Sequence, residues 1–322
     1  MKLLTVCIPC HNSIENMHKS ITSCLLLKEE IEVLIVDNCS QDETLSLAKE
    51  YEAQYPDTIR VIADNKKEFA LSQVIDQSQG LYFKLLKSGD YFDQPSLVSV
   101  IETLRDFIRI QANLDLLITD HKYICDHKKE QKVSYHHVFP TDTLFAWHGI
   151  KVFKKHFLVD LPSAIIKTSI LKNIKGLLDE EQFLPVYIMY GIVPYIKSMY
   201  YLPTYFYCCD GEKKVILHEL DDYMALLKKL WNVYDVFSLK SRRQRNFAIE
   251  QLSKIYIAIE YLVFKNGEKE KKNELDVYLQ ESHYKLFKAL TNNLFGTLLN
   301  IDNKKARGLI TRVFEKLYQN IE

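Results

Sequence analysis

Acidic residues in three separate segments of this 322-residue chain have the types and settings needed to bind a nucleotide or accept a proton. The segment 82–95, YFKLLKSGDYFDQP, holds Asp90 close to Lys87. Asp37 directly follows a short apolar run, and an acidic run begins at Asp179. Carboxylates of this kind accept hydrogen bonds from a nucleotide, bind a divalent cation or take a proton from a hydroxyl group.

Short apolar runs and helical periodicity alternate through the first 120 residues and would position these acids. The sequence predicts strands over 3–8, 31–36, 59–63, 81–86 and 114–119, and helices over 13–27, 40–51, 69–78 and 96–111. This alternation predicts a doubly wound α/β sheet with right-handed crossovers. Such sheets bind ligands at the carboxyl ends of their strands, and both Asp37 and the segment 87–90 fall at such ends.

The hydrophobic pattern of the sequence changes after about residue 215. From 218 onward, apolar residues recur at helical spacing among Lys and Glu, which predicts a helical C-terminal region over 216–322. Its apolar stripes fit packing on the first domain, a homo-oligomer or a partner contact equally well. The basic cluster 240–245, KSRRQR, is typical of a solvated helix junction, with contact to anionic lipid or to a partner as the alternative. The aromatic run 187–207 indicates core.

Composition narrows the class of protein. The 42 basic and 42 acidic residues balance, so no overall field favours nucleic acid. The seven cysteines follow no framework spacing, which indicates free thiols, and Cys7-x-x-Cys10 ends a buried strand, which favours packing over redox or zinc chemistry. The apolar run 3–8 is too short for a signal peptide. We expect a cytoplasmic protein with at most peripheral contact to the inner face of the membrane.

Four segments in order resemble family 2 glycosyltransferases of the GT-A fold. They are CIPCHN (7–12), EVLIVDNCSQDET (32–44), the stretch 64–80 and LLKSGDYFDQPSL (85–97), and GLLDEEQF (176–183) more loosely resembles the segment with the catalytic base. The resemblance implies a GT-A domain, a Rossmann-like, doubly wound mixed sheet, over 1–215. Residues 1–95 would be its nucleotide-binding half and 96–215 its acceptor half, followed by the helical C-terminal region.

The resemblance also implies roles for individual residues. The nucleotide-sugar site would be lined by Pro9, His11, Asn12, Asp37, Asn38, Asn65, Lys87 and Asp90. Asp179 would be the catalytic base, with Glu180 and Glu181 as competitors. Plainer interpretations stay open: Asp37 as a loop cap, Asp90 as a turn residue after Gly89, and the acidic run at 179 as a helix cap.

The acidic motif itself departs from the family pattern. Where the family reads Leu-Asp-x-Asp-Asp, this chain reads Leu86-Lys87-Ser88-Gly89-Asp90. Two alternatives follow. Either Asp90 still binds a divalent cation, Mn²⁺ or Mg²⁺, or metal binding is weak or absent and Lys87 supplies positive charge near the donor diphosphate.

The resemblance implies an inverting glycosyltransferase that moves a sugar from a nucleotide-sugar donor, a UDP-sugar by resemblance, to a hydroxyl of a glycan, glycoprotein or glycolipid. The alternative is a catalytically inactive, transferase-like subunit that acts through its helical C-terminus. A nucleotidyltransferase is disfavoured because no Gly-rich phosphate loop with a following Lys occurs near residue 10.

Overall fold

The computed structural model describes residues 1–64, 70–125, 129–151, 159–180, 182–211, 218–291 and 314. The chain divides into two compact units, the first made of residues 1–152 and 161–212, the second of 153–160 and 213–322. The division of the chain into functional domains at residue 215 stays a prediction.

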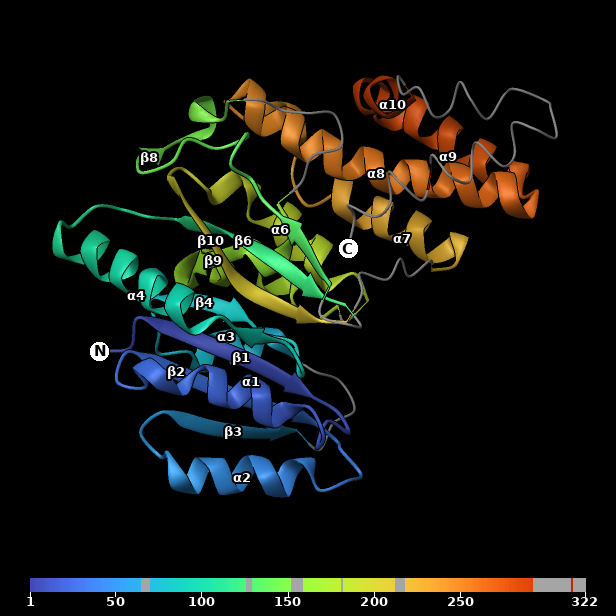
Figure 1. The fold of residues 1–322 in the computed structure, drawn as a ribbon. Helices are drawn as coiled ribbons and strands as arrows, with labels where there is room; N and C mark the ends of the chain where they lie inside the picture. The colour runs from blue at the N-terminus through green and yellow to red at the C-terminus, as the bar shows by residue number, and fades with distance from the viewer. Residues whose placement is uncertain are drawn as a thin grey trace. The chain divides into compact units, whose positions relative to one another are not determined.

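The first unit is built around one mixed sheet. Its strands are β1 (Leu4–Cys10), β2 (Ile31–Asn38), β3 (Ile59–Asp64), β4 (Tyr82–Leu85), β5 (Tyr91–Phe92), β6 (Leu116–Ile124), β7 (Glu130–Val133), β8 (Leu144–Phe145), β9 (Ala164–Lys167) and β10 (Met199–Asp210). The strand order is β3-β2-β1-β4-β9-β6-β10-β5, with β7 beside β6 and β8 beside β10. In Figure 1 the strands β3, β2, β1 and β4 follow one another upward in this order.

The chain reverses its direction across the sheet at β1. From β1 it moves to β2 and β3 on one side, and then crosses to β4 on the other side, with all these pairs parallel. A reversal of this kind opens a crevice at the carboxyl ends of the strands. The loops after β1, β2 and β4 therefore meet at the edge where ligands bind.

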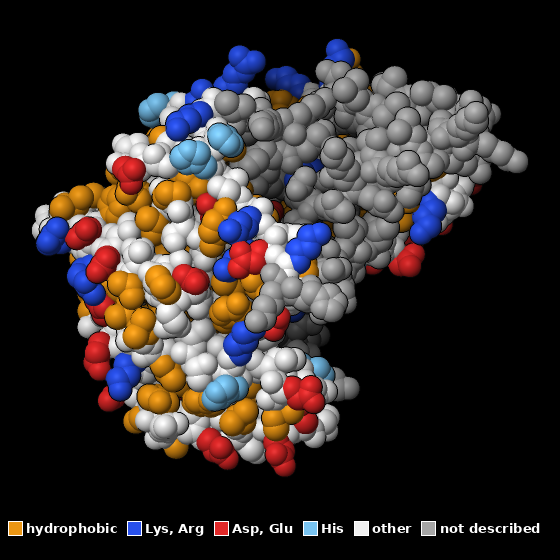
Figure 2. Space-filling model, in the orientation of Figure 1, with side chains coloured by type: hydrophobic (Ala, Val, Ile, Leu, Met, Phe, Trp, Pro, Cys, Tyr) orange, Lys and Arg blue, Asp and Glu red, His pale blue; other side chains and the backbone are white. Residues whose placement is uncertain are grey.

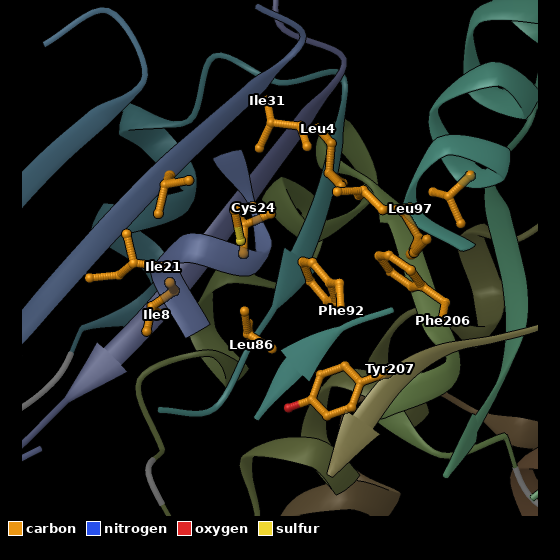
Figure 3. Close-up of a cluster of buried hydrophobic side chains, with 14 of the residues drawn as sticks. Leu4, Ile8, Ile21, Cys24, Ile31, Leu86, Phe92, Leu97, Phe206 and Tyr207 are labelled. Carbon is orange, nitrogen blue, oxygen red and sulfur yellow. The ribbon is translucent and has the colours of Figure 1, made fainter. Parts of the chain in front are cut away.

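Helices cover both faces of this sheet. In chain order the α-helices of the first unit are α1 (Met17–Ser23), α2 (Thr44–Gln54), α3 (Leu71–Gln77), α4 (Gln94–Arg109), α5 (Thr168–Leu171) and α6 (Leu184–Gly191). One core cluster joins alternate strand residues such as Leu4, Val6 and Ile8 to apolar residues of α1, α2 and α4. Figure 3 shows Leu4 and Ile8 in this cluster together with Leu97 of α4. The buried Leu71, Val74 and Ile75 of α3 lie outside that cluster and cover the opposite face.

The helix predicted over 13–27 is shorter in the structure. Residues 13–16 form a turn before α1, because the Ser13 N–H donates to Thr44 Oγ1 (2.8 Å) and the Ser13 hydroxyl donates to the carbonyl of His11 (3.1 Å). α4 begins as predicted for the 96–111 segment, after Asp93, whose Oδ2 accepts from the N–H of Ser96 (3.2 Å). Asp93 is thus a helix cap.

The strand β10 was not predicted from the sequence. It pairs in parallel with β6 and antiparallel with β5, and its aromatic side chains are largely core, with Tyr201 and Phe206 fully buried. β10 brings residues 207–210 beside the short strand that follows Asp90.

The second unit is helical, with α7 (Leu220–Trp231), α8 (Arg242–Asn266), α9 (Lys269–Ser282) and α10 (Tyr284–Thr291). Residues 251–263 of α8 are buried on every side, so α8 is a core helix rather than a surface helix with one apolar stripe. Ser241 caps α8, and Arg245 Nη1 donates to the Leu239 carbonyl (2.5 Å). These contacts fit a helix junction within 240–245. None of the helices described combines the length and apolar composition needed to cross a membrane.

Candidate active site

The loops that follow β1 and β2 are bound to each other. His11 Nδ1 lies 2.7 Å from the Asn38 carbonyl oxygen, and the Asn12 N–H donates to Ser40 Oγ (3.0 Å). Asn12 Oδ1 in turn accepts from the Gln41 N–H (2.8 Å). Asn12 adopts a left-handed backbone (φ 48°), which asparagine tolerates well. Three of the residues assigned to the nucleotide site, His11, Asn12 and Asn38, are therefore held together in one structure.

Asp37 lies at the end of β2, beneath these loops. Its side chain is only 3% exposed, and its Oδ2 accepts from the Ser40 N–H (3.1 Å). Its Oδ1 is buried and has no hydrogen-bond partner. A buried carboxylate oxygen without a partner costs free energy that a ligand donor would recover. Asp37 is thus both a loop cap and an open acceptor.

The end of β1 lies between Asp37 and the segment after β4. Pro9 is half-buried opposite Val36, and Cys10 pairs with Asp37 in the register of β1 and β2. Burial raises the pKa of the Cys10 thiol to about 12, opposed by a hydrogen bond with Ser88 and reinforced by the charge of Asp37. Cys7 is also buried and its pKa is raised by burial. Both cysteines are free and protonated, so this pair serves packing.

Residues 87–90 form a tight turn. The Asp90 N–H donates to the Lys87 carbonyl (3.0 Å), and Gly89 has φ +98°, a conformation that L side chains rarely adopt. Ser20 of α1 fixes the turn, because its Oγ accepts from the Gly89 N–H (2.9 Å) and donates to the Asp90 carbonyl (2.7 Å). The Lys87 side chain is exposed.

The carboxylate of Asp90 is engaged by β10 on both oxygens. The Tyr207 hydroxyl donates to Oδ2 (2.7 Å), and the Asp210 N–H donates to Oδ1 (2.8 Å). Tyr207 also accepts from the Lys87 N–H (3.0 Å). Burial raises the pKa of Asp90, and the bonds from Tyr207 and Asp210 oppose that shift. Figure 3 shows Tyr207 at the margin of the core cluster, with its hydroxyl oxygen at the tip.

A buried lysine lies against the ring of Tyr207. Lys84 Nζ is 4.9 Å from the ring centroid and donates to the carbonyls of Leu161 (3.1 Å), Pro162 (2.5 Å) and Ala164 (3.1 Å). Burial lowers the pKa of Lys84 to about 7, partly offset by Cys209 and Asp90. Lys84 thus ties the 161–164 segment to the same support that holds Asp90.

Asp179 lies at the N-terminus of α3. Its Oδ1 accepts from the Ser72 N–H (3.0 Å) and its Oδ2 from the Ser72 hydroxyl (2.8 Å). The other end of α3 lies at the amino edge of the sheet, where the Gln79 N–H donates to Glu32 Oε2 (2.8 Å). Asp179 is therefore at the carboxyl edge, exposed to solvent, and it caps a helix distant in sequence rather than its own.

Two other predicted residues are less defined. Glu180 is exposed beside Asp179. Asn65 and Glu181 lie outside the described residues.

Residues 5–108 match the family model described as Glycosyl transferase family 2. This segment belongs to that family. The glycosyltransferase AglE of Haloferax volcanii is 32% identical over 96 residues, which is 28% of this chain and 31% of that protein. The chain thus spans less than a third of the length of this curated relative.

Solved structures show the same fold over the whole chain. TarS 1–349 of S. aureus has a TM-score of 0.60 at 15% identity, covering 99% of this chain and 90% of that one. The same fragment in complex with UDP has a TM-score of 0.58 at 14% identity, covering 100% and 89%. The predicted GT-A fold class, a mixed α/β sheet followed by helices, is confirmed.

The family 2 acidic motif implies a divalent cation, and the residues at Asp90 do not fit one. Both Asp90 oxygens already accept protein hydrogen bonds, and Lys87 and Gly89 replace acids of the family pattern. Within the part of the chain that the structure describes, no group of three or more His, Cys, Asp or Glu side chains is placed to hold a metal ion.

Sequence analysis missed the residues that support this family 2 motif from outside it. They are Ser20, Lys84, Tyr207 and Asp210. Tyr207 belongs to an aromatic run that predicts core, and its ring is indeed buried. Only the spatial pairing of β5 with β10 reveals that its hydroxyl meets Asp90. No local pattern carries that information.

Proposed function

We propose that this chain transfers a sugar from a nucleotide-sugar donor to a hydroxyl group of a glycan, glycoprotein or glycolipid. The observation that carries the proposal is the buried, unpartnered Oδ1 of Asp37 at the carboxyl edge of a family 2 sheet. An acceptor in that place suits an N–H donor of a nucleotide base. His11 and Asn12 in the adjoining loop would line the same pocket.

A UDP-sugar is the donor we favour. Two of the TarS structures with which this chain shares its fold are complexes, one with UDP and one with UDP-GlcNAc. The imino N–H of uracil is a single strong donor that matches one open carboxylate oxygen. The Lys87 side chain and the turn 87–90, after the neighbouring β4, would face the diphosphate.

The reaction would be one in-line displacement with inversion. The acceptor oxygen attacks the anomeric carbon, the bond from that carbon to the diphosphate oxygen breaks, and the nucleoside diphosphate leaves. A carboxylate takes the acceptor proton, and we assign this role to Asp179 with Glu180 as the competitor. The hydrogen bonds from the N–H and the hydroxyl of Ser72 hold the Asp179 carboxylate in place.

Binding is tested first by thermal unfolding of the purified chain with a panel of nucleotide sugars. A ligand at a hundred times its Kd stabilises the folded state by about 2.7 kcal/mol, so the true donor stands out from the panel. UDP-sugars are expected to raise Tm and GDP-sugars are not. Absence of a shift with every nucleotide sugar would favour the inactive, partner-binding subunit.

Transfer is tested by release of nucleoside diphosphate with the selected donor and an acceptor panel. Asp179→Asn or Glu180→Gln is expected to lower the rate about 10²- to 10⁴-fold, the range of general base catalysis. Glu50→Gln, an exposed acid on α2, is the matched control and should keep the native rate. Native rates in both site variants would remove the assigned base.

A cytoplasmic location, peripheral membrane contact, and oligomer or partner contacts through the C-terminal helices stay predictions.

A further inference from the structure

We propose that the Lys87 ammonium, rather than a divalent cation on Asp90, offsets the negative charge of the donor diphosphate, and that Tyr207 keeps Asp90 in this metal-free arrangement. The inference rests on the proposed function, since it concerns the same donor site.

The first step is the state of the Asp90 carboxylate. A metal ligand must present free lone pairs toward the ion, but Asp90 is 7% exposed and each of its oxygens accepts a hydrogen bond shorter than 3 Å. Each of these bonds uses one lone pair of its oxygen, so a cation at Asp90 would compete with the Tyr207 hydroxyl and the Asp210 N–H for a buried acceptor. Asp90 is therefore built as an anchor for the turn.

The second step is the lack of a second acid to share an ion with Asp90. Asp210 is next to it, but its carboxylate pairs with Lys19 (3.1 Å). Gly89 stands at a family acid position with φ +98°, where an aspartate would be strained. A single buried carboxylate supplies only a small part of the octahedral oxygen shell that Mg²⁺ takes, so waters and the diphosphate itself would have to supply the rest.

The third step is the positive charge itself. Lys87 occupies another family acid position, so the charge there changes from negative to positive. Its side chain is exposed on the turn, and among the described residues the structure records no ion pair for it. The turn lies at the carboxyl end of β4, beside β1 at the switch point of the sheet. A cation in this place supplies the charge that a metal would otherwise bring to the leaving diphosphate.

Tyr207 is the residue that fixes this geometry. One hydroxyl holds both the carboxylate of Asp90 and the backbone N–H of Lys87, so it sets the turn that presents the lysine. The fully buried Lys84 supports the tyrosine ring from one side. Tyr207 is a positioning residue, because its hydroxyl acts on the turn 87–90 and through it on Lys87.

Calorimetry with UDP and with uridine separates the diphosphate from the base. The native chain is expected to bind UDP equally, within about twofold, in Mn²⁺ and in EDTA. Lys87→Ala should weaken UDP binding about tenfold and leave uridine binding unchanged, because uridine carries no phosphate. Lys49→Ala, an exposed lysine on α2, is the matched control. Thermal unfolding checks that each variant is folded.

Two results would overturn the inference: UDP binding that requires Mn²⁺, or native UDP affinity in Lys87→Ala. Failure to bind both UDP and uridine is a different result, because it would overturn the proposed function and this inference with it.

A second variant tests Tyr207 without touching the donor. Tyr207→Phe removes the hydroxyl, frees one Asp90 oxygen and releases the Lys87 N–H. Its UDP binding is expected to become Mn²⁺-dependent, with a Kd in EDTA at least about threefold above that in Mn²⁺. Merely structural damage would weaken binding equally in both buffers, and that outcome would remove the role given to Tyr207.

Discussion

Two buried carboxylates lie at the same edge of the sheet and differ in their hydrogen bonding. Asp37 is 3% exposed and Asp90 is 7% exposed, so both have lost most of their contact with water. Asp37 keeps one oxygen without a partner, whereas both oxygens of Asp90 accept protein hydrogen bonds. Since an unpaired buried acceptor is costly, it persists where a ligand uses it. The pair suggests one carboxylate for binding and one for architecture.

The loops around the two acids also differ in which segments hold them. The 11–12 and 38–41 segments are bound chiefly to each other, next to the open oxygen of Asp37. The 87–90 turn is held by Ser20 from α1 and by Tyr207 from β10. The departure of this turn from the acidic pattern of family 2 thus coincides with support from distant segments of the chain.

The largest effect is expected for Asp90→Ala and should appear as lost stability. The change leaves the Tyr207 hydroxyl and the Asp210 N–H without their acceptor, at about 1–3 kcal/mol for each unsatisfied buried group. We expect the free energy of unfolding to fall by about 3 kcal/mol. Urea unfolding of the native and variant chains measures it. A loss below about 1 kcal/mol would mean that Asp90 is not an anchor.

Asp37→Asn is expected to act on binding instead. An asparagine still offers one oxygen to the Ser40 N–H, so stability should change by less than about 1 kcal/mol. The open Oδ1 acceptor would be replaced by an uncharged NH₂ group, which donates hydrogen bonds instead of accepting them. Affinity for UDP should fall by about 2 kcal/mol, roughly thirtyfold, in calorimetry. If Asp37→Asn lost as much unfolding free energy as Asp90→Ala, the two aspartates would not differ in role.

The two acids also differ in how well their environments could be predicted from the sequence. Asp37 lies at the end of a buried apolar run, so its place at the carboxyl edge follows from local pattern. The environment of Asp90 does not follow from local pattern. Its partner Tyr207 is 117 residues away, and the sequence around Tyr207 predicts only a core residue. Asp179 is similar: its acidic run predicted a base or a cap, and Ser72, the residue that it binds in the capped helix, lies 107 residues earlier.

The fold follows the same rule. The parallel strands β1 to β4 each form near their predicted positions, since each is encoded by its own apolar run. The position of β10 between β6 and β5 depends on contacts between segments far apart in the sequence. Local patterns specify elements, and long-range pairing specifies their neighbours.

Lys84 gives the Asp90 side of the edge a pH dependence near neutral pH. Its pKa is about 7 in the folded chain, against 10.5 for an ordinary lysine. Between these values the unfolded chain binds the proton that the folded chain has lost, so the free energy of unfolding rises with pH. The slope is at most about 1.4 kcal/mol per pH unit.

Lys84→Met should remove the rise in the free energy of unfolding between pH 7 and 9. Above this range the cysteine thiols, with an ordinary pKa of 9.0, also titrate in the unfolded chain. Urea unfolding at several pH values provides the comparison. Lys49→Met, at an exposed position, should keep the native slope. Parallel curves for the native chain and Lys84→Met would show that Lys84 stays charged when folded, held by its three carbonyl partners.

The smallest expected effect concerns the backbone of the 87–90 turn. A Cβ at Gly89 meets no atom closer than 3.5 Å, so Gly89→Ala is opposed by its φ of +98° and not by crowding. We expect a loss of about 1 kcal/mol in unfolding free energy. Gly176→Ala is the matched control, because its Cβ would meet nothing within 4 Å and its φ is not positive. That variant should be neutral or slightly stabilising. Equal stability of the two variants would mean that the turn relaxes at little cost, and the position would then accept the acid that family 2 carries there.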